Sequence, residues 1–281
     1  MACLARRKGK AKIASDAFAY PSITAVLIVH NEEGRIARRI ENLLASDYPS
    51  EYLEVLVVSD GSTDSTAQIA TRYSARRVRV LDCSPRAGKA SCLNRAMTES
   101  KGEIIVFADA RQRFASDTIS RLVSWFSDPG IGAVSGNLSI EASGSNVGKG
   151  VDAYWRLERI LRESEARFDS SIGCTGAVYA ARRALIESIP DDTILDDVVI
   201  PMRVTLKGYR VAFDRAASAF DPQALEPEKE RARKRRTLAG NLQMLCRYPG
   251  WLLPWRNRLW WQLISHKYLR LISPVFISFP F

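Results

Sequence analysis

Short apolar runs alternate with amphipathic segments through the first half of the chain. The apolar runs lie at residues 23–29, 55–58, 78–81 and 103–107. The run Val55 to Val58 has three β-branched residues in four, which is typical of a strand buried on both faces of a parallel sheet. The segments after the first three runs predict helices at residues 35–45, 65–73 and 90–97. This alternation predicts an α/β domain built from βα units.

An acidic residue lies at or just past the carboxyl end of three predicted strands: Glu32, Asp60 and Asp109. Ligands of open α/β sheets bind in the crevice outside these strand ends. One such turn alone is more typical of residues that cap the next helix. The repetition favours a ligand site, while the missing glycine fingerprint argues against a dinucleotide enzyme.

Gly88-Lys89 precedes the third predicted helix. Free amide groups and the helix dipole at such a position can hold an anion. The pair lacks the second glycine and the Lys-Ser/Thr step of a P-loop, so an ordinary loop is the alternative.

Composition sets broader limits. The 281 residues are enough for one large domain with appendages. The formal net charge of +10 indicates an anionic partner, such as nucleic acid, a phosphorylated substrate or an acidic membrane surface. Five cysteines without a Cys-x-x-Cys pair favour a reducing compartment over a disulfide framework or a zinc site. The basic residues 1–12 are not followed by the apolar segment of a signal peptide.

The polar clusters form a more specific pattern when they are taken in order. They are Asn31-Glu32-Glu33, Ser59 to Asp64, Gly88-Lys89, Phe107 to Ala110, Thr175-Gly176-Ala177, Leu195-Asp196-Asp197, Arg203 and Lys207 to Val211. Over residues 22–240 this pattern resembles the family 2 glycosyltransferases. The resemblance implies the GT-A fold, a Rossmann-like sandwich with a mixed central sheet. It also implies transfer of a sugar from a nucleoside diphosphate donor with inversion at the anomeric carbon.

The resemblance assigns the donor site to four residues. Glu32 and Asp60 match positions that hold the nucleoside, and Lys89 matches one near the donor phosphates. Asp109 matches the first carboxylate of the Asp-x-Asp motif, which would bind Mg²⁺ or Mn²⁺. Carboxylate and phosphate oxygens suit either cation. In isolation, Asp109 could equally be a turn residue.

The resemblance places the catalytic base at Asp197, where a carboxylate can accept the proton of an acceptor hydroxyl. Asp196, where the family often has Glu, is a further substrate-binding residue. The two carboxylates could alternatively be an N-cap and a first-turn acid, because residues 198–207 look helical.

Two positions depart from the family pattern. Arg111 replaces the second Asp of the metal motif, so the cation would rest on Asp109 alone or bind loosely. Of the Gln-x-x-Arg-Trp signature only Arg236 carries over, as a contact to the donor diphosphate. The basic run 229–236 could instead be a solvated helix face.

Residues 143–168 predict one long helix. The resemblance places the acceptor region after the metal motif, which makes Gly136-Asn137 and Cys174-Thr175-Gly176 candidates to line the acceptor pocket. Ordinary core and turn packing is the alternative for both segments.

The two ends differ in composition from residues 22–240. Residues 1–21 form a basic arm, and residues 241–281 are amphipathic and hold four of the six tryptophans, interleaved with basic residues. This combination predicts a helical segment in a membrane interface, with a C-terminal helix packed on the domain as the alternative. The apolar end is too short to span a bilayer, and we expect a chain cut where a transmembrane helix begins.

Together these features predict an inverting, metal-dependent glycosyltransferase at the cytoplasmic face of the cell membrane. Its expected partners are a nucleoside diphosphate sugar, a glycan or lipid acceptor and the membrane surface, without nucleic acid. The alternatives are a nucleotidyltransferase of related fold and a noncatalytic membrane adaptor that binds anionic lipid or nucleotide. The first would need a glycine-rich triphosphate loop, which residues 29–34 do not provide.

Overall fold

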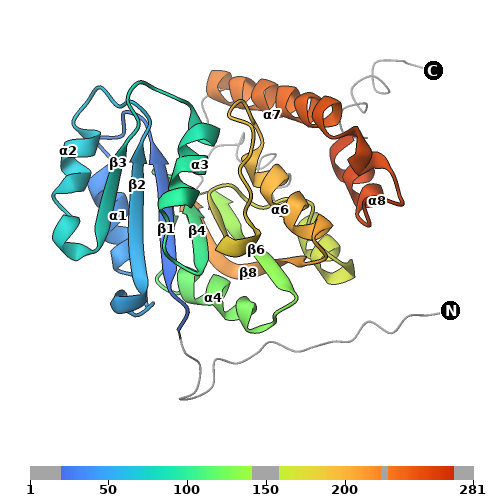
Figure 1. Cartoon of the computed structure of the whole chain (residues 1–281), viewed down its shortest axis with the longest axis horizontal. Helices are drawn as coiled ribbons and strands as arrows, with labels where there is room; N and C mark the ends of the chain where they lie inside the picture. The colour runs from blue at the N-terminus through green and yellow to red at the C-terminus, as the bar shows by residue number, and fades with distance from the viewer. Residues whose placement is uncertain (1–19, 141–157, 223–226, 269–281) are drawn as a thin grey trace.

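A computed structural model describes residues 20–140, 158–222 and 227–268 of the chain (Figure 1). Within these residues, one eight-stranded sheet has the order β3-β2-β1-β4-β7-β6-β8-β5. Its strands are β1 Ile23–Val29, β2 Leu53–Ser59, β3 Val78–Asp82, β4 Ile104–Ala108, β5 Arg113–Phe114, β6 Ile131–Ile140, β7 Val178–Arg182 and β8 Arg210–Asp221.

The first four strands are the ones that the apolar runs predict. β1 pairs in parallel with both β2 and β4, and β2 pairs in parallel with β3. The carboxyl ends of all four strands therefore meet at one edge of the sheet, where the polar clusters begin.

The second half makes the sheet mixed. β7 is antiparallel to both β4 and β6, whereas β6 and β8 are parallel and β5 pairs antiparallel with β8. The predicted mixed sheet is thus confirmed, although the positions of β5 to β8 are not among the predictions from the sequence.

The α-helices are α1 Ile36–Leu44, α2 Thr66–Thr71, α3 Lys89–Glu99, α4 Thr118–Ser124, α6 Asp196–Leu206, α7 Pro227–Arg247 and α8 Trp260–Leu263. Short 3₁₀ turns are η1 Ser50–Tyr52, η2 Ser74–Arg76, η3 Trp125–Ser127, η4 Arg183–Leu185 and η5 Pro249–Leu252, and α8 continues into the π-helical turn η6 Ile264–Tyr268. Of the predicted helix 143–168, residues 158–168 are helical and residues 143–157 lie outside the described part.

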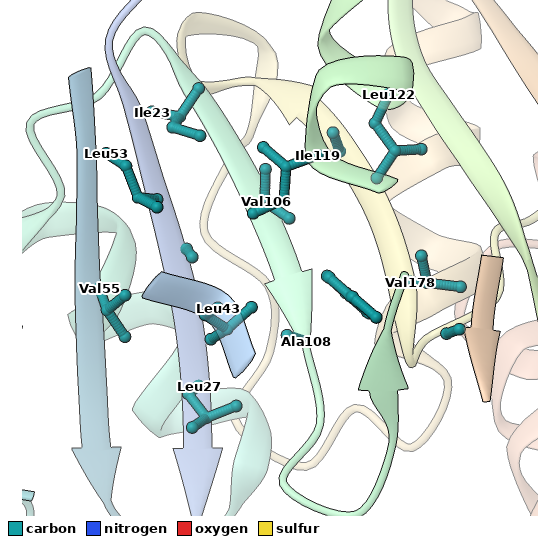
Figure 2. Close-up of a cluster of buried hydrophobic side chains, with 14 of the residues drawn as sticks. Ile23, Leu27, Leu43, Leu53, Val55, Val106, Ala108, Ile119, Leu122 and Val178 are labelled. Atoms are coloured by element: carbon teal, nitrogen blue, oxygen red, sulfur yellow. The ribbon is translucent and has the colours of Figure 1, made fainter. Parts of the chain in front are cut away.

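Two hydrophobic clusters cover the two faces of the sheet. Alternate residues of β1, β2 and β4 pack under α1, α2 and α4 on one face, and the residues between them pack under α3 and α6 on the other. Figure 2 shows part of the first cluster, in which strand side chains such as Val106 face Leu43 of α1 and Ile119 and Leu122 of α4. Successive side chains of a strand point to opposite faces of the sheet, and here both faces are buried. The apolar runs are therefore continuous.

Helix α7 extends across the domain boundary predicted after residue 240. It packs on the loop that precedes α6, since a Cβ added at Gly240 would lie 2.6 Å from Leu195 Cγ. Gln243 accepts a hydrogen bond from the Ile194 amide, and Arg247 forms an ion pair of 2.7 Å with Asp192. Helices α7 and α8 lie at the end of the molecule away from α2 and β3 (Figure 1).

The tryptophans of the C-terminal segment have different environments. Trp251 is buried and stacks on Tyr248, whereas Trp255 and Trp261 are 76% and 58% exposed. In the described ranges, none of the helices has both the length and the apolar content that a membrane crossing requires. The basic arm falls almost wholly in residues 1–19, outside the described part.

Candidate functional site

The turns after β1 and β2 are joined by hydrogen bonds between the polar clusters. Asn31 adopts a left-handed conformation with φ of 53°, and its Oδ1 accepts the Thr63 amide at 2.8 Å. The Glu32 amide donates to Thr66 Oγ1 at 2.8 Å, while the Glu32 carboxylate pairs with Arg35. These contacts fix the positions of the two turns at the strand ends.

Asp60 anchors the loop that carries Lys89. Its carboxylate is 6% exposed, and Oδ1 accepts the amides of Ala87 at 2.7 Å and Gly88 at 2.9 Å. Burial opposes ionisation, but these hydrogen bonds outweigh it and lower the pKa of Asp60. Gly61 has φ of +59°, and a Cβ there would lie 2.7 Å from the Arg86 amide nitrogen. Gly61 therefore leaves room for the loop to approach the end of β2, and Asp60 holds the loop there through its hydrogen bonds.

Asp60→Ala should lower the free energy of unfolding by about 2 kcal/mol, since hydrogen bonds to a charged group are worth about 1.5–3 kcal/mol. Asp60→Asn keeps an acceptor oxygen and should lose clearly less. Urea unfolding of both variants measures the difference. Equal stability of the wild type and Asp60→Ala would show that the carboxylate does not hold the loop.

Lys89, Asp109 and Asp196 meet at the carboxyl ends of β1 and β4. Lys89 Nζ lies 3.1 Å from Asp196 Oδ2 and 4.0 Å from Asp109 Oδ1. The three side chains line one pocket, together with residues of β1, β4 and α3 and with Gly176. Burial lowers the pKa of Lys89, but the charge of Asp196, followed by that of Asp109, outweighs burial and raises it. The ammonium group is therefore fully charged at neutral pH.

Asp197 follows Asp196 in the first turn of α6 and lies against a glycine-rich loop. A Cβ added at Gly176 would be 3.1 Å from Asp197 Oδ2, and the Asp197 carbonyl accepts the Cys174 amide at 2.8 Å. Burial, followed by the charge of Asp196, raises the pKa of Asp197. A carboxylate with a raised pKa is a stronger proton acceptor, which suits a general base.

The two segments predicted to line an acceptor pocket contact each other beside Asp197. Thr175 Oγ1 donates to the Gly136 carbonyl at 3.2 Å, and Arg162 Nη1 donates to Thr175 Oγ1 at 2.6 Å. A Cβ at Gly136 would lie 2.6 Å from the Ala217 carbonyl, so only glycine fits there. These contacts place the two segments side by side, and their role in acceptor binding stays a prediction.

A family model described as "Glycosyl transferase family 2" matches residues 24–189, more than half of the chain. The chain belongs to glycosyl transferase family 2. Among relatives, it is 27% identical over 205 residues to a beta-monoglucosyldiacylglycerol synthase of Synechocystis sp., covering 68% of this chain and 42% of the relative. It is 25% identical over 204 residues to a poly-beta-1,6-N-acetyl-D-glucosamine synthase of Staphylococcus aureus, covering 70% and 49%. The chain thus spans less than half the length of these relatives.

Solved structures of glycosyltransferases confirm the predicted fold. The mannosyltransferase PcManGT from Pyrobaculum calidifontis, in complex with GDP-Man and Mn²⁺, has a TM-score of 0.71 and 27% identity, covering 86% of this chain and 69% of its own. TarS of S. aureus in complex with UDP-GlcNAc has a TM-score of 0.58 and 16% identity, covering 80% and 66%. At that identity the likeness to TarS shows the fold alone.

Two predicted donor residues of this family 2 chain lie apart from the Lys89 cluster. Arg236 is exposed on α7, and its side chain makes no hydrogen bond or ion pair with another described residue. The carboxylate of Glu32 is occupied by Arg35. Contact of either residue with a donor remains a prediction.

The metal motif retains one available carboxylate. Asp109 is 42% exposed, whereas Arg111, at the second position of the motif, forms an ion pair of 2.8 Å with the buried Asp221. In the described ranges, no group of three His, Cys, Asp or Glu side chains could hold a metal ion. A divalent cation at Asp109 would need phosphate and water ligands, which is how Mg²⁺ is commonly bound. A single protein carboxylate is therefore compatible with a cation that binds together with the diphosphate of the sugar donor.

Two charged groups reach the site from distant segments and are not recognisable in the sequence. Arg162 and Lys267 both lower the pKa of Asp197 and so offset part of the effect of Asp196. Lys267 belongs to the segment predicted to contact lipid, and its neighbour His266 is held by Glu165 at 2.6 Å and Glu158 at 3.3 Å. The single lysine in Ser265-His266-Lys267 carries no sequence signal of this role, because only tertiary packing brings it near Asp197.

Proposed function

We propose that this chain is the catalytic part of an inverting glycosyltransferase that moves a sugar from a nucleoside diphosphate donor to a hydroxyl acceptor. The observation that carries the proposal is the convergence of Lys89, Asp109 and Asp196, with Asp197 adjacent, at the carboxyl ends of the parallel strands. This edge is where open α/β sheets bind ligands. Membership of family 2 supports the same reaction class.

In this proposal, Asp197 accepts the proton of the acceptor hydroxyl as the hydroxyl oxygen attacks the anomeric carbon from the face opposite the diphosphate. The bond from the anomeric carbon to the diphosphate oxygen breaks as the new glycosidic bond forms, which inverts the configuration. Lys89 stabilises the charge that develops on the leaving diphosphate, because its ammonium group is already held in place by Asp196. Asp60 positions Lys89 through the loop amides.

Asp109 would hold a divalent cation together with the donor phosphates. When bound, Mg²⁺ or Mn²⁺ would neutralise charge on the diphosphate as it leaves. The similarity to PcManGT, whose structure contains GDP-Man and Mn²⁺, supports this part of the proposal. It does not select between the two cations for this chain.

We further propose that the enzyme acts in glycolipid or polysaccharide synthesis at the cytoplasmic face of the membrane. The names of the Synechocystis and S. aureus relatives support a lipid or glycan acceptor. The exposed Trp255 and Trp261 support contact with a membrane interface, where indole rings are favoured.

Hydrolysis of nucleoside diphosphate sugars without acceptor tests the proposed reaction. The full chain would be incubated with UDP- and GDP-linked hexoses and N-acetylhexosamines, with Mn²⁺, Mg²⁺ or EDTA. We expect release of nucleoside diphosphate from one donor, loss of release with EDTA, and product of inverted configuration when an acceptor is added. A chain that releases nucleotide from none of these donors, with or without candidate acceptors, would contradict the proposal.

The double variant Trp255→Ala/Trp261→Ala should bind vesicles of phosphatidylglycerol and phosphatidylcholine about tenfold more weakly, because two interfacial indoles are lost. Cosedimentation measures this binding. Trp125→Ala, which removes a half-exposed indole of η3, is the matched control and should bind as the wild type does. Equal binding of all three proteins would exclude these tryptophans as the membrane contact.

A further inference from the structure

A second pocket lies between the start of α1, β5 and the end of β8. Five arginines line it, with no carboxylate among the described lining residues, which are Arg35, Arg38, Arg39, Asn42, Ala110, Arg111, Gln112, Arg113, Phe220 and Pro222. Helix α1 packs on the face of the sheet opposite α3, the helix that begins at Lys89. The arginine pocket is therefore distinct from the Lys89 pocket.

Arg39 is the buried part of this pocket. It is 2% exposed, its Nε donates to the Asp109 carbonyl at 2.9 Å, and its Nη1 donates to Asn42 Oδ1 at 2.6 Å. Its Nη2 is buried without a hydrogen-bond partner. A guanidinium is always protonated in proteins at neutral pH, so Arg39 carries its charge in this buried position. An unpaired buried donor on a charged group is costly unless a ligand satisfies it.

The neighbouring polar groups are also incompletely paired. Asp221 is fully buried and accepts hydrogen bonds from Arg111 at 2.8 Å and Gln112 at 2.9 Å through Oδ2, while its Oδ1 has no partner. Gln112 Oε1 is likewise buried without a partner. Buried polar atoms are normally paired, so unpaired atoms in and beside one pocket indicate missing partners. Arg39 Nη2 requires an acceptor, such as a phosphate oxygen, whereas Gln112 Oε1 and Asp221 Oδ1 require donors, such as a hydroxyl or water.

Arg38 supplies a second available guanidinium. It is exposed on the first turns of α1, and its side chain makes no hydrogen bond or ion pair with another described residue. Arg35 and Arg111 pair with Glu32 and Asp221, so their charges are partly neutralised. Guanidinium groups recognise phosphate through paired, charge-assisted hydrogen bonds, which matches one buried and one exposed arginine facing a common space.

We infer that the arginine pocket binds a phosphate group, separately from the donor site. The bound phosphate would accept hydrogen bonds from Arg39 Nη2 and Arg38, and a hydroxyl on the same ligand would satisfy Gln112 Oε1. The phosphate could belong to a soluble phosphorylated molecule or to a phospholipid headgroup, since both present the same oxygens. Because Arg39 Nε also donates to the Asp109 carbonyl, a phosphate bound at Arg39 would be linked to the backbone of the metal motif through this one side chain.

Calorimetric titration of the full chain with inorganic pyrophosphate, without divalent metal, tests binding by a soluble phosphate. We expect Arg38→Ala to weaken binding about tenfold, the loss expected for one charge-assisted hydrogen bond. Arg72→Ala removes the same charge from an exposed position at the end of α2, outside the pocket lining, and should bind as the wild type does. In a Lys89→Met background, which weakens the donor site, Arg38→Ala should still bind pyrophosphate about tenfold more weakly than Arg72→Ala, which separates this binding from the donor site.

Vesicle cosedimentation in the Trp255→Ala/Trp261→Ala background tests a phospholipid source. If phosphatidylglycerol vesicles bind and Arg38→Ala but not Arg72→Ala releases them, the ligand is a headgroup; if only pyrophosphate binds in that pattern, it is soluble. The inference is overturned if neither probe distinguishes Arg38→Ala from Arg72→Ala, or if Lys89→Met alone abolishes pyrophosphate binding. Circular dichroism confirms folding, and Arg39 is left intact because its removal could unfold the loop of Asp109.

Discussion

Asp197→Asn should reduce sugar transfer by about a thousandfold, because positioned general bases contribute about 10²–10⁴-fold to rates. The amide matches the carboxylate in shape and leaves the hydrogen bond from Cys174 to the Asp197 carbonyl in place. Binding of the nucleoside diphosphate should therefore change little. Initial rates of transfer, together with calorimetry of nucleotide binding, measure the two effects separately.

The matched control is Asp191→Asn, an exposed acid in the loop before α6 that accepts a hydrogen bond from Asn94. It should transfer sugar at the rate of the wild type. In the wild type, transfer should also fall in acid at a higher pH than an ordinary aspartate would give, because burial and Asp196 raise the pKa of Asp197. Unchanged turnover in Asp197→Asn would remove this residue from the mechanism.

Lys89→Met should slow hydrolysis of the donor by about a hundredfold, since a preorganised charge near a leaving group is worth about 10²–10³ in rate. The variant also leaves Asp196, whose side chain is 7% exposed, without its cation partner. We therefore expect weaker binding of nucleoside diphosphate in addition to slower release. Single-turnover hydrolysis with and without Mn²⁺ measures both effects.

Lys101→Met provides the comparison for the Lys89 variant. Lys101 is exposed and lies in the loop before β4, at the amino end of that strand and so away from the carboxyl ends that form the site. Its rate should equal that of the wild type. A Lys89→Met protein that folds and hydrolyses the donor normally would show that the lysine only neutralises Asp196. Thermal unfolding of both variants distinguishes a lost charge from a lost fold.

The strands β1 to β4 could be predicted because each is a continuous apolar run that both faces of the sheet bury. β6 and β8 are harder to recognise, since Gly132 and Gly136 interrupt one and Asp214 to Ala216 the other. The two glycines of β6 reflect close packing, since a Cβ at Gly132 would lie 2.5 Å from Val204 Cγ1. In β8 the interruption is polar and solvent-facing, because Arg215 and Ala216 are exposed. Glycines that allow close packing do not contribute to the alternation of apolar and polar side chains. The hydrophobic pattern alone therefore does not locate such a strand.

The site shows a similar division. The sequence predicts a cleft at the strand ends formed by Glu32, Asp60, Asp109 and Asp197, with Lys89 and Arg236 over the diphosphate. The structure brings Lys89 together with Asp109 and Asp196 at this edge, whereas the functional roles of all six residues stay predictions. The sequence does not predict that Asp60 would bind the Lys89 loop, because this contact depends on where the loop after β3 folds back. Arg162 and Lys267 are absent from the prediction for the same reason: only tertiary packing brings them near Asp197.

The contacts between α7 and the loop before α6 determine where this chain can be truncated. A protein ended at residue 240 would keep every recognisable sequence motif of the family, yet it would lack Gln243 and Arg247, which hold Ile194 and Asp192. The loop that leads into α6, whose first turn holds Asp196 and Asp197, would lose these two contacts. We therefore expect a minimal active unit to extend through α7, beyond the last motif that the sequence shows.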